Sequence, residues 1–175
     1  MGFVFAAVFL WQARPGLRSM MASLLLVAPG LWLRGYASGY VKKNAELATT
    51  GPYAHTRNPL YLGSMLIAFG FAAAAASWVI LIALAALFAV IYIPTIQSEE
   101  AYLRAHFAGF DAYARRVPRL LPRVTAAPDA GAEAEELDAG GFSRELYRKH
   151  REYNALVGAV AIYTALALKF AFLQR

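Results

Sequence analysis

A dense run of polar and aromatic residues occupies positions 51–63, directly before a long apolar stretch. Pro59 can sit at the first turn of a helix, and Asn58 then stands at the N-cap position. Such a helix points its free amides and its positive dipole end toward Arg57, an arrangement that suits a carboxylate or a phosphate. In the alternative interpretation, Arg57 anchors to lipid phosphates and the nearby tyrosines form an interfacial belt.

A second polar run begins at Glu99 and Glu100, which follow an apolar segment without a spacer. Carboxylates at a membrane boundary are costly unless they are solvated or paired. One of them could bind ribose hydroxyls or a cation, or pair with Arg57, and the alternative is a solvated helix end. Two polar runs on one face of a membrane predict a site at the boundary between water and lipid.

Composition places this chain among membrane proteins. Its 175 residues are 59% hydrophobic with a mean hydropathy of +0.44, whereas about half is usual in soluble domains. The absence of cysteine excludes disulfides and thiolate chemistry, and the dispersed histidines show no metal-ligand spacing. We assign the net charge of +6 to basic residues at a cytoplasmic face, and expect no nucleic-acid partner.

The apolar segments predict an all-α integral membrane protein with four to five transmembrane helices. Residues 2–11 are too short to span, so they form a half-membrane segment or begin a helix that continues, kinked, past Pro15. Gly35 and Gly39 form a small-residue pair that would admit a neighbouring helix. The predicted spans, of which the middle two form a helical hairpin with its turn at Ser77, are residues 20–40, 60–77, 78–96 and 155–172.

Apolar residues recur at three- and four-residue spacing in 99–117, which predicts one cytoplasmic amphipathic helix at the membrane surface. Arg119, just beyond it, is expected to meet lipid headgroups. Ser143 is a predicted N-cap for a basic helix that leads into the last span. Lys169 in that span is expected to snorkel to the interface.

Basic residues set the predicted orientation. Residues 41–58 hold three Lys and Arg, residues 98–152 hold nine, and the turn near Ser77 holds none. The rule that cytoplasmic loops are basic therefore predicts a multi-pass protein with both polar runs facing the cytoplasm. Arg34, within the second apolar segment, is either functional or snorkels from near the helix end.

Together the two polar runs resemble the isoprenylcysteine carboxyl methyltransferase family and the related phospholipid N-methyltransferases. The resemblance covers residues 30–122 as a methyltransferase-like core of a single membrane domain, 1–175. A linker, 123–142, and a C-terminal helix with an extra span, 143–175, complete the predicted organisation. The residues that carry the resemblance are Gly51-Pro52-Tyr53, Arg57-Asn58-Pro59-Leu60-Tyr61-Leu62-Gly63, Glu99-Glu100, Phe107, Tyr113 and Val117-Pro118.

The resemblance implies an enzyme that uses S-adenosylmethionine to methylate a lipophilic substrate entering sideways from the lipid bilayer. Arg57 and the helix start at Pro59 would hold the methionine carboxylate, and Glu99 or Glu100 would bind the nucleoside or the amino group. The implied catalytic residues are Arg57, Asn58 and Glu99. The implied cofactor-binding residues are Glu46, Leu47, Ala48, Tyr53, Asn58, Pro59, Leu60, Tyr61, Glu99 and Glu100.

Two departures from the family pattern narrow this expectation. Asn58 replaces a histidine and cannot titrate near neutral pH. Thr95 stands where the isoprenylcysteine enzymes place a substrate arginine, which argues against a prenylcysteine carboxylate. The added last span could line a different substrate pocket or form the interface of a homodimer. Two other interpretations stay open: an NADPH-dependent reductase of the sterol-reductase type, using Lys42 and Lys43, and a non-catalytic scaffold or lipid-binding protein.

Overall fold

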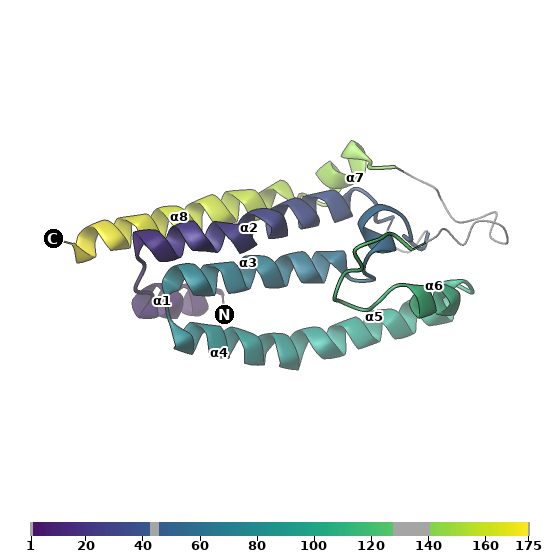
Figure 1. Cartoon of the computed structure of the whole chain (residues 1–175), viewed down its shortest axis with the longest axis horizontal. Coiled ribbons are helices and arrows are strands. Elements are labelled where there is room, and N and C mark those ends of the chain that lie inside the picture. Colours follow the sequence, from purple (N-terminus) through teal and green to yellow (C-terminus); the bar gives the residue numbers. More distant parts are fainter. Residues whose placement is uncertain (1, 43–45, 128–140, 175) are drawn as a thin grey trace.

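A computed structural model describes residues 2–42, 46–127 and 141–174. Every regular element in these ranges is a helix, which confirms the predicted all-α membrane fold. Figure 1 shows four long helical rods, α2, α3, α4 continued by α5, and α8, lying lengthwise beside one another. The loops that carry the polar runs, together with α6 and α7, gather at one end, and the C-terminus lies at the other.

The first two helices are separate elements. Helix α1, Gly2–Gln12, ends before a short break, and α2, Leu17–Ser38, then continues through Pro29. The Arg14 amide in this break donates to the Ala75 carbonyl, 2.7 Å away, at the end of α3. One kinked helix across Pro15 is therefore wrong. With 11 residues, α1 reaches about 16 Å, roughly half of the hydrocarbon core.

Close packing between α2 and α3, Pro59–Ala75, depends on glycine. A Cβ atom on Gly30 would lie 2.9 Å from the Gly63 carbonyl oxygen, and a Cβ on Gly63 would lie equally close to the Gly30 carbonyl oxygen. The two backbones therefore touch, as small residues permit in membrane helices. The glycine pair expected to admit a neighbouring helix, Gly35 and Gly39, contacts rings from within and just before the short helix α7.

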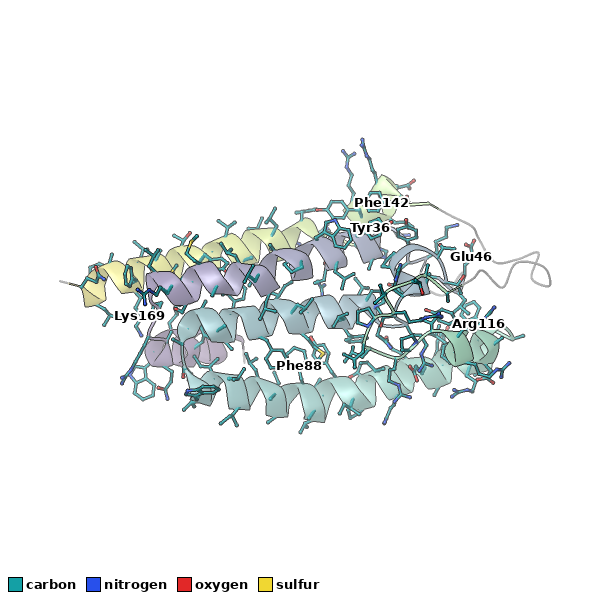
Figure 2. All side chains as sticks on the ribbon, viewed as in Figure 1. Tyr36, Glu46, Phe88, Arg116, Phe142 and Lys169 are labelled. Carbon is teal, nitrogen blue, oxygen red and sulfur yellow. The ribbon has the colours of Figure 1, made fainter. Side chains whose placement is uncertain are left out.

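The hairpin after α3 has the predicted tight, uncharged turn. Ala76 takes a left-handed conformation (φ 49°) and the Ser77 side chain caps α4, Trp78–Leu87. A π-helical stretch, Phe88–Tyr92, then joins α4 to α5, Ile93–His106. Figure 2 shows Phe88 lying between this rod and α3, and its ring stacks on Phe69 with centroids 5.5 Å apart.

The single amphipathic helix expected over 99–117 is wrong. Helix α5 runs to His106, Phe107 is extended, and a separate short helix, α6, spans Phe110–Arg116. The break lets the α6 side chains turn inward, away from the line of α5. Four buried residues then form a small core beside the polar loops: Leu47, Phe110, Tyr113 and Val117.

Among the described residues, three helices are long and apolar enough to cross a membrane: Leu17–Ser38, Trp78–His106 and Tyr153–Leu173, the last being α8. Helix α3 is apolar but shorter. Ser143 caps α7, Arg144–Lys149, as predicted. The Lys169 ammonium donates to the carbonyls of Leu10 and Trp11 at the end of α1 (Figure 2). Most of the predicted linker, residues 128–140, lies outside the described residues.

Candidate functional site

The loop that precedes α3 is fixed from outside by residues 118–127, here called the strap. The loop begins with a 3₁₀ turn, Gly51–Ala54, whose first residue has a positive φ of 57°. Three main-chain hydrogen bonds of 2.9 Å then join the loop to the strap, and the two segments run antiparallel. The bonds run from Arg57 N to Pro118 O, from Arg123 N to His55 O and from Ala127 N to Ala54 O.

Glu100 is the centre of a buried ion-pair cluster. Its side chain is 6% exposed, forms an ion pair with Arg57 Nη2 at 3.4 Å and accepts a hydrogen bond from Arg119 Nη2 at 2.8 Å. Arg119 Nε contacts the same carboxylate, at 3.1 Å. The predicted pairing of an acidic residue with Arg57 is therefore present. Arg119, expected at lipid headgroups, instead binds Glu100, and this hydrogen bond raises the pKa of the arginine.

Arg57 has capacity for a further acceptor. Its side chain is 12% exposed, and its Nε is buried with no hydrogen-bond partner among the described residues. The guanidinium carbon lies 6.0 Å from the centre of the Phe110 ring, on the inner side of α6. Because buried donors are nearly always paired, the orphaned Nε marks this arginine as incompletely satisfied.

Asn58 occupies the N-cap position of α3 without capping it. Within the described part of the chain its side chain makes no cap hydrogen bond, and its Nδ2 instead donates to the Arg119 carbonyl at 2.9 Å. The neighbouring Thr56 hydroxyl donates to the Leu120 carbonyl at 3.0 Å. Both side chains therefore hold the strap, and Asn58 leaves the first amides of α3 uncapped.

The two acidic residues have different surroundings. Glu99 is exposed and accepts a hydrogen bond from the Tyr61 hydroxyl at 2.8 Å. Tyr61 packs its ring edge against Tyr92, which links the first turn of α3 to the rod formed by α4 and α5. Glu100 is held by two guanidinium groups, so Glu99 is the carboxylate that faces outward beside α3.

Two buried tyrosines, Tyr53 and Tyr113, lie in the loop and in α6. The Tyr113 hydroxyl donates to the Tyr53 carbonyl at 2.9 Å. Burial raises the pKa of both tyrosines, so both are neutral at physiological pH. The charges of Glu99 and Glu152 lie near enough to add to the rise for Tyr53.

The expected cofactor residues at 46–48 do not all lie with this group. Leu47 packs in the small core with Tyr113. Glu46 pairs with Lys42 at 2.9 Å, and together with Ala48 it lines a separate small depression between the end of α2 and the start of α7. Figure 2 places the Glu46 side chain at the outer edge of the polar end.

A second charged cluster was not predicted from the sequence. Arg34 donates from Nε and Nη2 to the two carboxylate oxygens of Glu152, at 3.0 and 2.9 Å. Its Nη1 contacts the Ser64 hydroxyl and the Leu60 carbonyl. Arg34 is therefore bound within the protein, by Glu152 on one side and by the start of α3 on the other. The available signal was an intramembrane arginine in need of a counter-ion and an acid at the start of the last span.

An apolar groove of about 630 Å³ lies on the α2 side of α3. It opens between the two helices, the 50–56 loop and the strap, and His55 and Thr56 supply polar atoms at its loop end. Trp32 is 65% exposed beside it. Its helical walls are formed by Pro29, Trp32, Leu33, Tyr36, Leu62 and Leu66.

An all-helical membrane protein with a buried arginine–carboxylate site at one end is the class that the fold and the site define. Residues 19–109, just over half of the chain, match the phospholipid methyltransferase family. The protein belongs to that family, which includes the isoprenylcysteine carboxyl methyltransferases and the phospholipid N-methyltransferases. The resemblance stated from the motifs is thereby confirmed.

Two curated relatives are also similar over 106 residues, 61% of the chain. The chain is 38% identical to the nickel-cobalt-cadmium resistance protein NccN of Alcaligenes xylosoxydans xylosoxydans, covering 49% of that protein. It is 37% identical to the cobalt-zinc-cadmium resistance protein CzcN of Cupriavidus metallidurans, covering 48%. The chain thus spans about half the length of these relatives. No solved structure matches.

Proposed function

We propose that this protein is a multi-pass membrane methyltransferase that uses S-adenosylmethionine and methylates a lipophilic substrate at the cytoplasmic interface. Family membership and the apolar helices support the class, and the basic polar end supports its orientation toward the cytoplasm. One observation carries the site. The incompletely paired Arg57 lies beside the uncapped first turn of α3, inside the region that matches the family.

These residues fit the charged groups of S-adenosylmethionine. Arg57 and the amides that follow Pro59 would hold its carboxylate, because both offer unpaired donors and positive potential. Glu99 would accept from its ribose hydroxyls or ammonium group, while Glu100 keeps the arginines in place. Asn58 and the neutral Tyr53 add uncharged polar surface. Glu46, Leu47 and Ala48 stay predicted contacts, as do Leu60 and Tyr61.

The bound cofactor supplies an activated methyl group on a sulfonium. The protein's part is then to align the acceptor and exclude water, rather than to titrate. Replacement of the family histidine by Asn58 suits that role, since an amide holds its hydrogen bond at any working pH. Arg57, Asn58 and Glu99 are accordingly the residues to which we assign catalysis by positioning.

We assign the apolar part of the substrate to the groove between α2 and α3. The groove is walled by apolar side chains of two membrane helices, and its loop end reaches His55 and Thr56, which lie three and two positions before Asn58. Its volume of about 630 Å³ is within the usual range for a small-molecule site. An apolar chain could therefore enter from lipid with its reactive end toward the polar loop.

Filling the groove tests this assignment. Leu66→Trp should raise the KM for the lipophilic acceptor about tenfold or more, because the larger ring occupies the space of the apolar chain, while affinity for S-adenosylhomocysteine stays unchanged. Val90→Trp, which enlarges a side chain that is 72% exposed on the outer rod, is the matched control. Equal acceptor kinetics in both variants would remove the groove from the substrate path.

The two other interpretations have less support. A reductase needs basic groups for an additional phosphate, but Lys42 is paired with Glu46 and Lys43 lies outside the described residues. A non-catalytic scaffold leaves the buried, incompletely paired Arg57 without a purpose. The relatives' names refer to metal resistance, yet the described residues hold no group of three or more potential metal-binding side chains.

Calorimetric titration of the purified, detergent-solubilised protein with S-adenosylhomocysteine, and separately with NADPH, tests the proposed function. We expect saturable binding of the homocysteine compound alone. Arg57→Ala and Glu99→Gln should each weaken it about 10- to 100-fold, the effect of losing one charged hydrogen bond. Arg104→Ala is the control, because Arg104 also lies over the Phe110 ring but is exposed. Binding of NADPH alone, or of neither compound by folded protein, would reject the proposal.

A further inference from the structure

The Arg34 guanidinium joins three helices at the polar end. Its Nε and Nη2 form a two-pronged ion pair with Glu152, the residue that precedes α8. Its Nη1 points the other way, to the Ser64 hydroxyl and to the Leu60 carbonyl at 3.4 Å. One side chain of α2 therefore bridges the start of α8 and the first turn of α3.

Leu60 is the point where this bridge meets the proposed cofactor site. The Ser64 hydroxyl also donates to the Leu60 carbonyl, at 2.9 Å, so two donors converge on the residue that follows Pro59. The stem of Arg34 lies over Gly63, where an added Cβ would approach the arginine Cγ to 2.7 Å. The beginning of α3 is thus held in position by contacts that depend on Arg34.

Glu152 gives the C-terminal segment a role in this arrangement. A charged arginine in a membrane helix is costly without a partner, and Glu152 supplies that partner with a side chain 12% exposed. Two contacts with the end of α2 place it there: the Ser143 amide donates to the Gly39 carbonyl, and His150 Nδ1 lies 3.0 Å from the Ser38 carbonyl. Figure 2 shows Phe142 beside Tyr36 at the same junction.

We propose that Arg34 is a positioning residue for the cofactor site and that Glu152, from the C-terminal segment, is its required counter-ion. Arg34 acts through the Leu60 carbonyl and the first turn of α3. The charges of Arg34 and Glu152 also reach the buried Tyr53, as the charge of Glu99 does. This inference rests on the proposed function, because it assumes that the cofactor binds at the start of α3.

Variants of the full-length protein test the proposal, with Tyr163→Phe as the matched control. Tyr163 also joins α8 to α2, through a 2.7 Å contact with Ser23, but it lies three turns from Glu152. Arg34→Met and Glu152→Gln should each weaken S-adenosylhomocysteine binding at least tenfold, whereas Tyr163→Phe should change it less than twofold. Arg34→Lys should recover part of the affinity, because it keeps the charge but not the forked geometry.

The double variant Arg34→Met with Glu152→Leu separates positioning from stability and also serves if a single variant fails to fold. Removing both charges should return the melting temperature toward that of the wild type, since an apolar pair can replace a buried ion pair. Affinity for S-adenosylhomocysteine should stay at least tenfold reduced, because the Leu60 carbonyl still lacks the Arg34 donor and keeps only that of Ser64. Full recovery of affinity along with stability would overturn the positioning role.

Amide hydrogen exchange of the cofactor-free protein gives an independent measurement. Arg34→Met should speed exchange of the amides in residues 58–66, and Tyr163→Phe should not. Equal exchange in the two variants would overturn the proposal. If the wild type bound no S-adenosylhomocysteine, the proposed function would fail, and the exchange comparison would still decide whether Arg34 orders the start of α3.

Discussion

Two charged clusters lie at the polar end of the molecule, and they are built in opposite ways. In the Glu100 cluster, one buried carboxylate forms ion pairs with two arginines, Arg57 and Arg119. In the Arg34 cluster, one arginine binds the Glu152 carboxylate on one side and the Leu60 carbonyl, in the first turn of α3, on the other. The first therefore joins loops to α5, and the second joins helices to one another.

This difference separates their roles in the fold and in the proposed site. The Glu100 cluster fixes the strap and leaves Arg57 with an unpaired donor that a ligand can use. In the Arg34 cluster all three guanidinium nitrogens have protein contacts. A cluster with a remaining donor suits binding, and a fully paired cluster suits positioning.

The largest stability effect should come from removing the shared carboxylate. Glu100→Gln leaves two arginines without a counter-charge, one of them buried, and breaking a buried ion pair typically costs about 3–5 kcal/mol. Glu152→Gln should cost less, because Arg34 is 26% exposed and keeps its contacts with Ser64 and Leu60. Thermal unfolding in one detergent, read by intrinsic fluorescence, measures the difference.

Glu99→Gln is the control for this comparison. It changes the neighbouring acid, which is exposed and accepts a hydrogen bond from Tyr61, so its melting temperature should stay close to that of the wild type. Equal losses in the Glu100 and Glu152 variants would contradict the distinction between a shared and a single carboxylate. A loss in the Glu99 variant as large as in the Glu100 variant would do so as well.

Local sequence signals predicted most of the helical framework. Apolar length located the long helices, and the predicted turn at Ser77 and cap at Ser143 marked two helix starts. Pro59 marked the start of α3. The expected contact between Arg57 and an acidic residue followed from two polar runs on one face. Each of these features depends on neighbouring residues or on the alignment of helix ends.

Features that depend on tertiary packing were missed. The three- and four-residue spacing of apolar side chains predicted helix correctly, but not the break at Phe107. The chain breaks there because the α6 side chains turn inward to pack with Leu47. Glu152 is 118 positions away from Arg34 along the chain, so nothing local links them. The close backbone contact of Gly30 with Gly63 was missed for the same reason, because the two glycines lie on different helices, α2 and α3.

Gly63 connects the family motif to the Arg34 cluster. Its substitution should destabilise the protein less than Glu100→Gln does. A Cβ at this position would lie 2.9 Å from the Gly30 carbonyl oxygen and 2.7 Å from the Arg34 Cγ. Since backbone cannot yield as a side-chain tip can, Gly63→Ala should destabilise the protein by about 1–3 kcal/mol, the usual range for overpacking. The measurement is again thermal unfolding, together with hydrogen exchange of residues 58–66.

Gly158→Ala on α8 is the matched substitution. No described atom outside its own helix backbone and chain neighbours lies within 4 Å of the added Cβ, so the better helix propensity of alanine, about 1 kcal/mol, should appear as a small gain. Gly63→Ala should lose stability and also speed exchange at the start of α3, as Arg34→Met does. If it lost stability with unchanged exchange, Gly63 would serve only the contact between α2 and α3, and the Arg34 cluster would not depend on the motif glycine.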